Sequence, residues 1–297
     1  MFNKCIFVDH APKIFGQLRT FSGIKGKDYL ESIGYNSLIS HIMFGNLQPM
    51  TLIGSSGKSG SFFFYSYDNY YLIKAIPERE FFSLKRRLKH YYHHIKKNPE
   101  SVLVRIYGMH KLKFYKNKKL KKTLYICIMN NVLCNRSSIT NMVYDIKGST
   151  YKRSKEPGQS KNAPFKDMDF VRKKDKILLE NNDYEKLISS IQKDVEFLQK
   201  FNLIDYSLLI SIPKNQNNSL KNDLIQEKTE KDESWYFNHI DSYRIGIIDY
   251  LTNFSSCKQV ESIFKRSLCG KGVSCIPPEK YGKRFFEFIS EKVIEKK

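Results

Sequence analysis

The sequence lacks long apolar runs and the cysteine spacings of metal-binding or disulfide-rich proteins. No apolar stretch approaches the roughly 20 residues that a membrane-spanning helix needs, and no secretory signal is recognisable. The six cysteines form no CxxC pair and no zinc-like spacing with the seven histidines. These absences argue against a transmembrane or zinc-binding protein and favour reduced thiols in the cytosol.

Acidic residues are also scarce. There are 30 Asp and Glu against 51 Lys and Arg, which leaves a net charge of +21. Such an excess predicts a polyanionic partner: nucleic acid, an anionic membrane leaflet or a phosphorylated small molecule. We find no zinc finger, RNP-like aromatic strand or helix-turn-helix, so the sequence argues against nucleic acid. A non-catalytic module that binds an anionic membrane remains an alternative to an enzyme.

The hydrophobic pattern of the first half predicts antiparallel strands with a helix across them. Two strand runs, Ser61–Tyr67 and Tyr70–Ile76, flank hairpin-turn residues. A long amphipathic helix, Glu78 to Asn98, separates them from two further strands, Val102–Phe114 and Leu124–Met129. This order is typical of an α+β layer. The sequence begins directly on a strand-like piece near residue 4. Whether a longer N-terminal part precedes this piece is left open.

The second half predicts a second lobe. A helix runs from about Asp183 to Asn202, with Asn182 or Asp183 as its N-cap. Residues 214–234 are polar without periodicity and predict a flexible insertion. We place the two lobes at residues 1–131 and 132–297. The remaining expected elements are the strands Val143–Ile146, Ser207–Ile212 and Tyr243–Asp249 and the helix Glu279–Ile294.

A glycine-rich segment precedes the first hairpin. It reads Gly54-Ser-Ser-Gly57-Lys-Ser-Gly60-Ser61, and such spacing lets the backbone approach an anion and offer N–H donors. It is not a Walker A loop, because Leu52 stands where that motif needs glycine and a strand follows instead of a helix. A flexible turn remains the alternative interpretation.

A lysine and a glutamate follow in the order of an ATP-binding lobe. Lys74 lies in an otherwise apolar strand, and Glu80 begins the next helix. Glycine-rich loop, strand lysine and helix glutamate are the parts that hold ATP phosphates in kinases. The alternative is a lysine on the solvent face of an edge strand.

The catalytic segments of protein kinases are missing, since the sequence contains neither HRDxxxxN nor DFG. Two aspartates nevertheless border strands: Asp205 in LIDYSLL and Asp249 in IGIID. Phosphoryl transfer needs a carboxylate near the attacking hydroxyl and at least one on Mg²⁺. The two aspartates can supply that chemistry.

Together, GSSGKSGS, LIK, IMNN, YDIKGSTYKR, DYSLL and IGIID resemble the phosphatidylinositol phosphate kinases, most closely the catalytic domain of the type I 4-phosphate 5-kinases. The resemblance covers nearly the whole chain and implies a two-lobed, kinase-like α+β fold of antiparallel sheets with flanking helices. It implies a lipid kinase that uses ATP and Mg²⁺ to phosphorylate the 5-hydroxyl of phosphatidylinositol 4-phosphate. The sister class, which phosphorylates the 4-hydroxyl of the 5-phosphate, is the alternative.

The resemblance also implies roles for individual residues. Lys147 would contact the nucleotide or the headgroup phosphate, Asp205 would position the inositol hydroxyl, and Asp249 would bind Mg²⁺. Lys152 and Arg153 would help to hold the lipid phosphate. The expected ATP-binding residues are Gly57, Lys58, Ser59, Gly60, Ser61, Lys74 and Glu80, with Met129, Asn130 and Asn131 as the adenine hinge.

The segment from Leu251 to Pro278 corresponds in this resemblance to the loop that selects the substrate and touches the membrane. Glu261 matches the type I pattern, and Lys258 is an expected substrate-binding residue. Lys258-Gln259 departs from the paired lysines of the family. The implied partners are a phosphoinositide on the cytoplasmic face of a membrane such as the plasma membrane, and a small GTPase or other activator.

Overall fold

The chain divides into two compact units in the computed structural model. The described residues are 3–34, 63–66, 68–133, 141–155, 158, 163–213, 239–240, 243–255 and 275–297. The first unit comprises Met1–Pro99 and Val104–Asn135, and the second comprises Glu100–Leu103 and Arg136–Lys297. The predicted boundary after residue 131 lies four residues before this division, and the short piece Glu100–Leu103 belongs to the second unit instead of the first.

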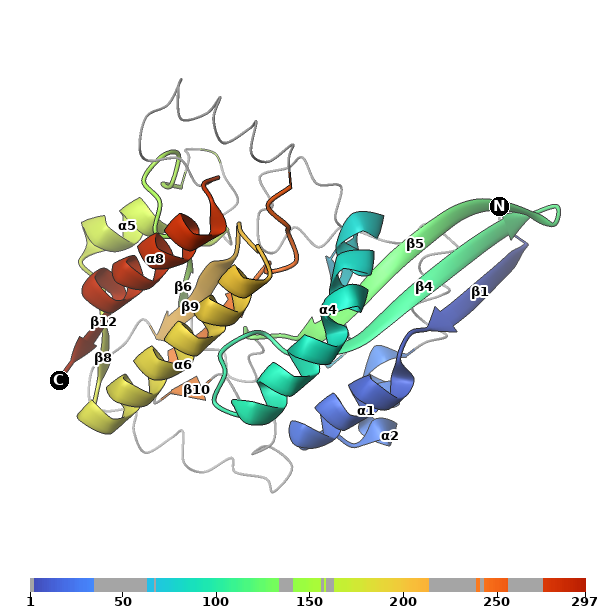
Figure 1. Cartoon of the computed structure of the whole chain (residues 1–297), viewed down its shortest axis with the longest axis horizontal. Helices are drawn as coiled ribbons and strands as arrows, with labels where there is room; N and C mark the ends of the chain where they lie inside the picture. The colour runs from blue at the N-terminus through green and yellow to red at the C-terminus, as the bar shows by residue number, and fades with distance from the viewer. Residues whose placement is uncertain are drawn as a thin grey trace. The chain divides into compact units, whose positions relative to one another are not determined.

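The first unit is built on an antiparallel five-stranded sheet in the order β1-β4-β5-β3-β2. Figure 1 labels β1, β4 and β5 of this sheet. Its strands are β1 Lys4–Asp9, β2 Phe63–Tyr65, β3 Tyr71–Ile76, β4 Ile106–Lys116 and β5 Lys119–Asn130. Its helices are α1 Pro12–Phe21, α2 Gly26–Ile33 and α4 Glu78–Lys97. Among these helices, α1 packs on β4 and on α4, and α4 packs on β5.

Helix α4 forms where the periodicity predicts it. Its apolar stripe is buried, and the basic side chains of the opposite face are exposed. Glu78 and Glu80 in its first turn and Lys96 and Lys97 in its last turn complement the helix dipole. The buried stripe consists of Phe81, Leu84, Leu88, Tyr91 and Ile95.

The second unit contains a five-stranded sheet in the order β10-β11-β9-β6-β7 and a two-stranded parallel sheet of β12 and β8. The strands are β6 Asn141–Ile146, β7 Phe165–Lys166, β8 Ile177–Leu179, β9 Ser207–Pro213, β10 His239–Ile240, β11 Tyr243–Ile248 and β12 Ile294–Lys296. The helices are α5 Asp167–Lys173, α6 Asn181–Lys200, α8 Pro278–Phe288 and the π-helix η3 Ile289–Val293. Helix α6 packs on α8 (Figure 1).

A buried aspartate on α6 explains why residues 100–103 belong to the second unit. The Asp194 carboxylate accepts hydrogen bonds from the Ser101 hydroxyl at 2.7 Å and from the backbone N–H groups of Val102 at 2.8 Å and Leu103 at 3.2 Å. Asp194 is fully buried, and such a group needs these donors to offset its desolvation.

One expectation for the second unit is wrong, because helix α6 begins at Asn181 with Glu180 as its N-cap and has no side-chain cap bond from Asn182 or Asp183. The predicted C-terminal helix forms as α8 and continues as the π-helix η3. The chain then pairs in parallel with β8 as β12.

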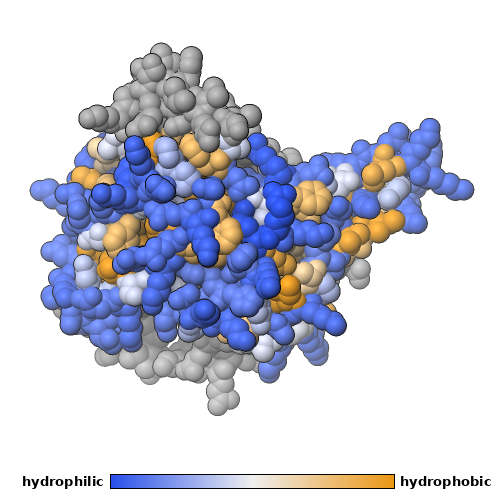
Figure 2. Space-filling view, viewed as in Figure 1, coloured by the Kyte–Doolittle hydropathy of each residue, from blue (hydrophilic) through white to orange (hydrophobic). Residues whose placement is uncertain are grey.

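Hydrophilic residues predominate on the face of the molecule drawn in Figure 2, with scattered apolar patches. No helix within the described ranges is long and apolar enough to cross a membrane. The cysteines that the structure describes, Cys5, Cys127 and Cys275, are free thiols. The predicted insertion at 214–234 lies outside the described residues.

Candidate active site

Three strands of the second unit bring their ends to the same edge of its larger sheet. β6 ends at Ile146, opposite Leu208 of β9, and β11 ends at Ile248, opposite Ser207 of β9. Both pairs are antiparallel, so the ends of β6 and β11 lie beside the beginning of β9. Residues just beyond these ends are therefore brought together.

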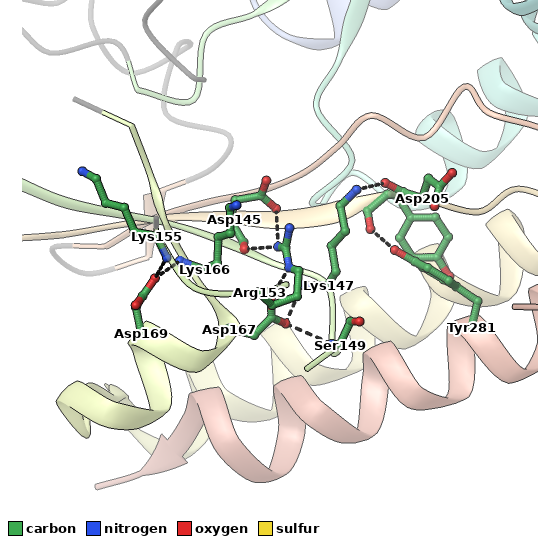
Figure 3. A network of polar contacts seen from close by, with 11 residues as sticks. Asp145, Lys147, Ser149, Arg153, Lys155, Lys166, Asp167, Asp169, Asp205 and Tyr281 are labelled. Atoms are coloured by element: carbon green, nitrogen blue, oxygen red, sulfur yellow. Dashed lines mark hydrogen bonds and ion pairs between the residues drawn. The ribbon is translucent and has the colours of Figure 1, made fainter. Parts of the chain in front are cut away.

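Those residues include Lys147, Asp205 and Asp249, the three that the sequence assigned to catalysis in this half of the chain. The Lys147 Nζ donates a hydrogen bond of 2.8 Å to the backbone carbonyl of Asp205 (Figure 3). The flanking segments also pair, since the Ile204 N–H donates to the Thr252 carbonyl at 3.0 Å. Backbone pairing thus fixes the loops that carry the two aspartates.

Both aspartates adopt a left-handed backbone conformation. The φ angle is 66° at Asp205 and 59° at Asp249. This region is uncommon for residues other than glycine, although aspartate enters it more readily than most, and a residue held there costs about 1–3 kcal/mol. The bond from Lys147 engages the backbone of Asp205 directly and so helps to hold that conformation.

Gly148 lets the turn after Lys147 approach α8 closely. Its φ is +65°, and a Cβ at this position would lie 3.0 Å from the Arg284 carbonyl oxygen and 3.2 Å from the Phe285 Cα and the Phe288 Cβ. Two of these three neighbours are backbone atoms that cannot rotate away. Glycine is therefore required for both the backbone conformation and the packing.

Tyr281 of α8 supports the backbone beside Asp205. Its hydroxyl donates a hydrogen bond to the Tyr206 carbonyl, and the two rings pack edge to face with centroids 4.7 Å apart (Figure 3). Burial raises the pKa of Tyr281 well above its usual range, and the negative charge of Asp205 adds to this. The hydroxyl therefore stays protonated and acts as a donor. No local pattern in the sequence marks this residue.

A buried carboxylate, Asp167 at the beginning of α5, holds the turn that carries Lys147. It accepts hydrogen bonds from the backbone N–H of Lys147 at 2.9 Å and of Ser149 at 3.1 Å, and from the Arg153 Nε at 2.5 Å (Figure 3). Asp167 is fully buried, so these donors replace its lost hydration. The Asp-x-Asp pair before Phe170 is a recognisable helix-start pattern, but no local pattern marks the backbone groups that Asp167 contacts.

Arg153 joins Asp167 to a second carboxylate. Its Nη2 lies 3.2 Å from Asp145 Oδ1 and also donates to the Asp145 carbonyl, and its side chain is only 12% exposed. Burial disfavours the charge of the guanidinium, but Asp145 and Asp167 more than offset this and raise the pKa of Arg153. These ion pairs give Arg153 a structural role, and its predicted contact with a lipid phosphate stays a prediction.

Lys152 lies beside this network but differs from it in exposure. Its ammonium lies 5.5 Å from the Tyr151 ring centroid, its side chain is exposed, and its φ is 54°. The ammonium of Lys152 is therefore hydrated, and keeping it charged in the folded protein carries no desolvation penalty. Its role in binding the headgroup also stays a prediction.

Replacing Asp167 by Asn is expected to lower the free energy of unfolding by about 3 kcal/mol, because it leaves a buried arginine without one of its two carboxylates. Urea denaturation followed by circular dichroism measures this. Arg172→Gln is the matched control, since the Arg172 side chain is 70% exposed in its ion pair with the buried Asp169 of the same helix, and Asp169 keeps its hydrogen bonds from the backbone N–H groups of Lys155 and Lys166. This control should cost less than about 1 kcal/mol. Equal losses in the two variants would contradict the structural role of Asp167.

In the first unit, Lys74 occupies the middle of a sheet. Strand β3 lies between β2 and β5, and Lys74 pairs with Phe63 on one side and Cys127 on the other. Its side chain is buried, with its ammonium 5.1 Å from the Phe63 ring centroid. A lysine on the solvent face of an edge strand is therefore excluded.

The buried thiol of Cys127 stands on β5, opposite Lys74 of β3. Burial raises the pKa of Cys127 to about 12, the positive charge of Lys74 lowers it, and the negative charge of Glu80 raises it. Both charges therefore act on one buried group of β5. The roles of Lys74 and Glu80 in binding ATP stay predictions.

The predicted hinge residues use their side chains to hold the backbone. The Asn130 Oδ1 accepts a hydrogen bond of 2.6 Å from the Arg105 N–H, and the Asn131 Nδ2 donates one of 2.8 Å to the Asn69 carbonyl. Met129 pairs with Leu72 on β3. The side-chain amides are thus structural, and adenine recognition by this segment stays a prediction.

The remaining predicted residues lie outside the described part of the chain. They are Gly57, Lys58, Ser59, Gly60, Ser61, Lys258 and Glu261. Within the described ranges, no group of three or more His, Cys, Asp or Glu side chains could form an all-protein metal site. Mg²⁺ bound with a nucleotide is usually held by one or two carboxylates and the phosphates, so Asp249 beside Asp205 fits that requirement.

Comparison with known proteins identifies close similarity to one family. The model of the family described as "Phosphatidylinositol-4-phosphate 5-Kinase" matches residues 44–239 and 238–292. A Plasmodium falciparum phosphatidylinositol 4-phosphate 5-kinase is 34% identical over 97% of this chain and 18% of its own length. The rat type-1 alpha enzyme is 30% identical over 99% of the chain and 58% of its own length, and the human type-1 beta enzyme is 28% identical over 98% and 58%. The chain thus spans about three fifths or less of the length of these relatives.

Proposed function

Because this chain belongs to the phosphatidylinositol-4-phosphate 5-kinase family, we propose that it transfers the γ-phosphate of ATP to the 5-hydroxyl of phosphatidylinositol 4-phosphate. The observation that carries this proposal is the meeting of Lys147, Asp205 and Asp249 at one sheet edge. A cation and two carboxylates are the groups that in-line phosphoryl transfer requires.

In this proposal Asp205 orients the inositol hydroxyl and accepts its proton. The hydroxyl oxygen forms a bond to the γ-phosphorus, the bond from that phosphorus to the bridging oxygen breaks, and ADP leaves. The left-handed backbone of Asp205 and its bond from Lys147 support a fixed direction for the carboxylate. Fixed groups of this kind lower the barrier because they need no rearrangement during the reaction.

Lys147 and Lys74 offset negative charge in the same proposal. Lys147 contacts the transferred phosphate or the headgroup, and Lys74, with Glu80, binds the phosphates of ATP. Mg²⁺, when bound with the nucleotide at Asp249, supplies further charge neutralisation. The burial of Lys74 on an interior strand of the sheet supports this role, because it restricts where the ammonium can lie.

The choice between substrates rests on a residue outside the described part of the chain. A glutamate at the position of Glu261 resembles the pattern of the type I enzymes, which phosphorylate the 5-hydroxyl of the 4-phosphate. Lys258, Lys152 and Arg153 are proposed to contact the lipid. An enzyme of the same fold that phosphorylates the 4-hydroxyl of the 5-phosphate is the competing function. Glu261→Ala should change the preference between the two monophosphates.

Labelled ATP and vesicles that contain either monophosphate test the proposal directly. We expect bisphosphate from the 4-phosphate alone, and we expect Glu261→Ala to lose part of that preference. Product from the 5-phosphate alone would overturn the substrate assignment while leaving the kinase assignment intact. If neither lipid is phosphorylated and Mg²⁺-ATP does not raise the melting temperature, the kinase assignment itself fails.

The net charge of +21 supports action at the cytoplasmic face of a membrane such as the plasma membrane. Imaging that finds no membrane enrichment of the tagged chain would contradict this location. A small GTPase is a proposed activator, and turnover on vesicles that no GTP-loaded GTPase alters would remove that proposal.

A further inference from the structure

The β4–β5 hairpin of the first unit ends in a concentrated basic tip. Residues 111–124 contain seven lysines and no acidic residue. We define the basic hairpin tip as residues 116–122. Its exposed lysines are Lys116, Lys118, Lys119, Lys121 and Lys122, and no ion pair involves them within the described part of the chain.

The tip has a defined shape. Asn117 and Lys118 have φ angles of 50° and 62°, and Lys116 pairs with Lys119 across the turn. Positive φ at both central residues is the signature of a two-residue type I′ turn, which matches the twist of the strands. Side chains alternate between the two faces of a ribbon, so the lysines surround the tip on both sides.

An apolar side chain stands among these charges. Leu120 is 51% exposed, although it is flanked by lysines on both sides. In the view of Figure 2 the projecting end of this hairpin, at the right, is hydrophilic with small apolar patches. A strand end that combines clustered lysines with an exposed leucine matches the two requirements of an anionic lipid interface: charge for the headgroups and an apolar group for the acyl boundary.

Nucleic acid fits the tip less well, because a hydrated phosphate backbone offers no site for the leucine.

The other basic face of this unit is also a weaker candidate for the docking surface. The exposed basic residues of α4 extend along most of the helix, and Glu78 and Glu80 lie in its first turn. None of the exposed large apolar side chains of the described chain lies on α4.

We propose that the basic hairpin tip docks the chain on an anionic lipid leaflet. The lysines contact the headgroups, and Leu120 enters the boundary between headgroups and acyl chains. This proposal deepens the proposed lipid-kinase function, but its central test measures binding to lipids that are not substrates.

The expected effect of the tip lysines is large. Each basic residue near an anionic leaflet strengthens binding about five-fold. Removing five such residues is therefore expected to weaken binding by at least about 100-fold, even if only some of them reach the surface at once. Added salt should weaken binding of the wild type in the same way, because it screens these contacts.

The first experiment is flotation of the full chain with phosphatidylcholine vesicles, with or without phosphatidylserine. The tip variant carries Lys→Gln at 116, 119, 121 and 122 and Lys118→Asn, because Asn tolerates the positive φ. The matched control removes the same number of charges from α4: Lys85, Arg86, Lys89, Lys96 and Lys97 to Gln. We expect phosphatidylserine-dependent binding to fall at least about 100-fold in the tip variant and much less in the control.

Leu120→Ser separates the apolar contribution from the charge. It is expected to weaken binding about ten-fold on anionic vesicles. Equal losses in the tip variant and the α4 control would overturn the proposal in favour of net charge alone. Unchanged binding of the tip variant would overturn it directly, and a wild type that binds homopolymer RNA but not phosphatidylserine vesicles would replace it with a nucleic-acid surface.

Turnover on a short-chain, water-soluble substrate distinguishes this proposal from the proposed function. The tip variant should retain wild-type turnover on monomeric substrate and lose turnover on vesicles. A wild type that binds phosphatidylserine vesicles through the tip but phosphorylates neither short-chain monophosphate would refute the kinase proposal and leave the docking proposal standing. A tip variant that loses turnover on monomers would show that these lysines serve the catalytic site, and the docking role would be withdrawn.

Discussion

Asp205→Asn is expected to lower kcat by about three orders of magnitude, because the amide cannot accept the proton of the inositol hydroxyl. The substitution keeps the size of the side chain, and asparagine tolerates the left-handed backbone at this position. The carbonyl that accepts the bond from Lys147 is unchanged. We therefore expect the loss in kcat without a loss of fold, measured on short-chain phosphatidylinositol 4-phosphate together with the melting temperature.

The same chemical change elsewhere provides the control. Asp183→Asn, in the first turn of α6, should leave kcat unchanged and cost only the few tenths of a kcal/mol to about 1 kcal/mol of a charge–dipole contact. If Asp205→Asn lowers kcat less than about ten-fold, the Asp205 carboxylate is not the group that accepts the proton.

Lys74→Met is expected to lower kcat/KM by about two to three orders of magnitude, because it removes the buried cation proposed to hold the ATP phosphates. Methionine has a similar length and adapts to irregular surroundings, so the sheet between β2 and β5 should survive. Kinetics with varied ATP and the Mg²⁺-ATP-dependent rise in melting temperature both measure the effect.

Lys113→Met makes the same replacement on β4 of the same sheet, at a half-exposed position. It should change neither the kinetics nor the stabilisation by nucleotide. Full stabilisation by Mg²⁺-ATP in Lys74→Met would show that the lysine does not contact the phosphates. The explanation of its burial would then have to come from Glu80 and the neighbouring ring of Phe63.

Periodicity predicted the two long helices because their buried stripes are mainly apolar. It could not place Asp194 on the buried face of α6, since the donors that repay its burial lie far away in the sequence, at residues 101–103. β12 was missed for a related reason. Its three residues continue a helical pattern, and only pairing with β8 makes them a strand.

The residues of the candidate site also fall into those that the sequence indicates and those that only the folded chain reveals. Lys147, Asp205 and Asp249 each stand in a short motif at a strand border, and antiparallel pairing brings those borders together. Their proximity could therefore be expected from the sequence, and their catalytic roles stay predictions. Asp167 and Tyr281 could not be expected, because a single aspartate and a single tyrosine carry no local signal of the backbone groups they contact. Arg153 was recognised as important, but its two carboxylate partners became evident only in the folded chain.

The packing of Gly148 against α8 has a consequence for synthesis on the ribosome. All strands of the first sheet precede residue 131, so that sheet can form while the second unit is still being translated. The candidate site is different, because the turn at Gly148 and the backbone beside Asp205 are both supported by α8. A nascent chain that has emerged only to residue 277 therefore carries Lys147, Asp205 and Asp249 without the helix that supports their backbone. The candidate site is complete only when α8 has left the exit tunnel.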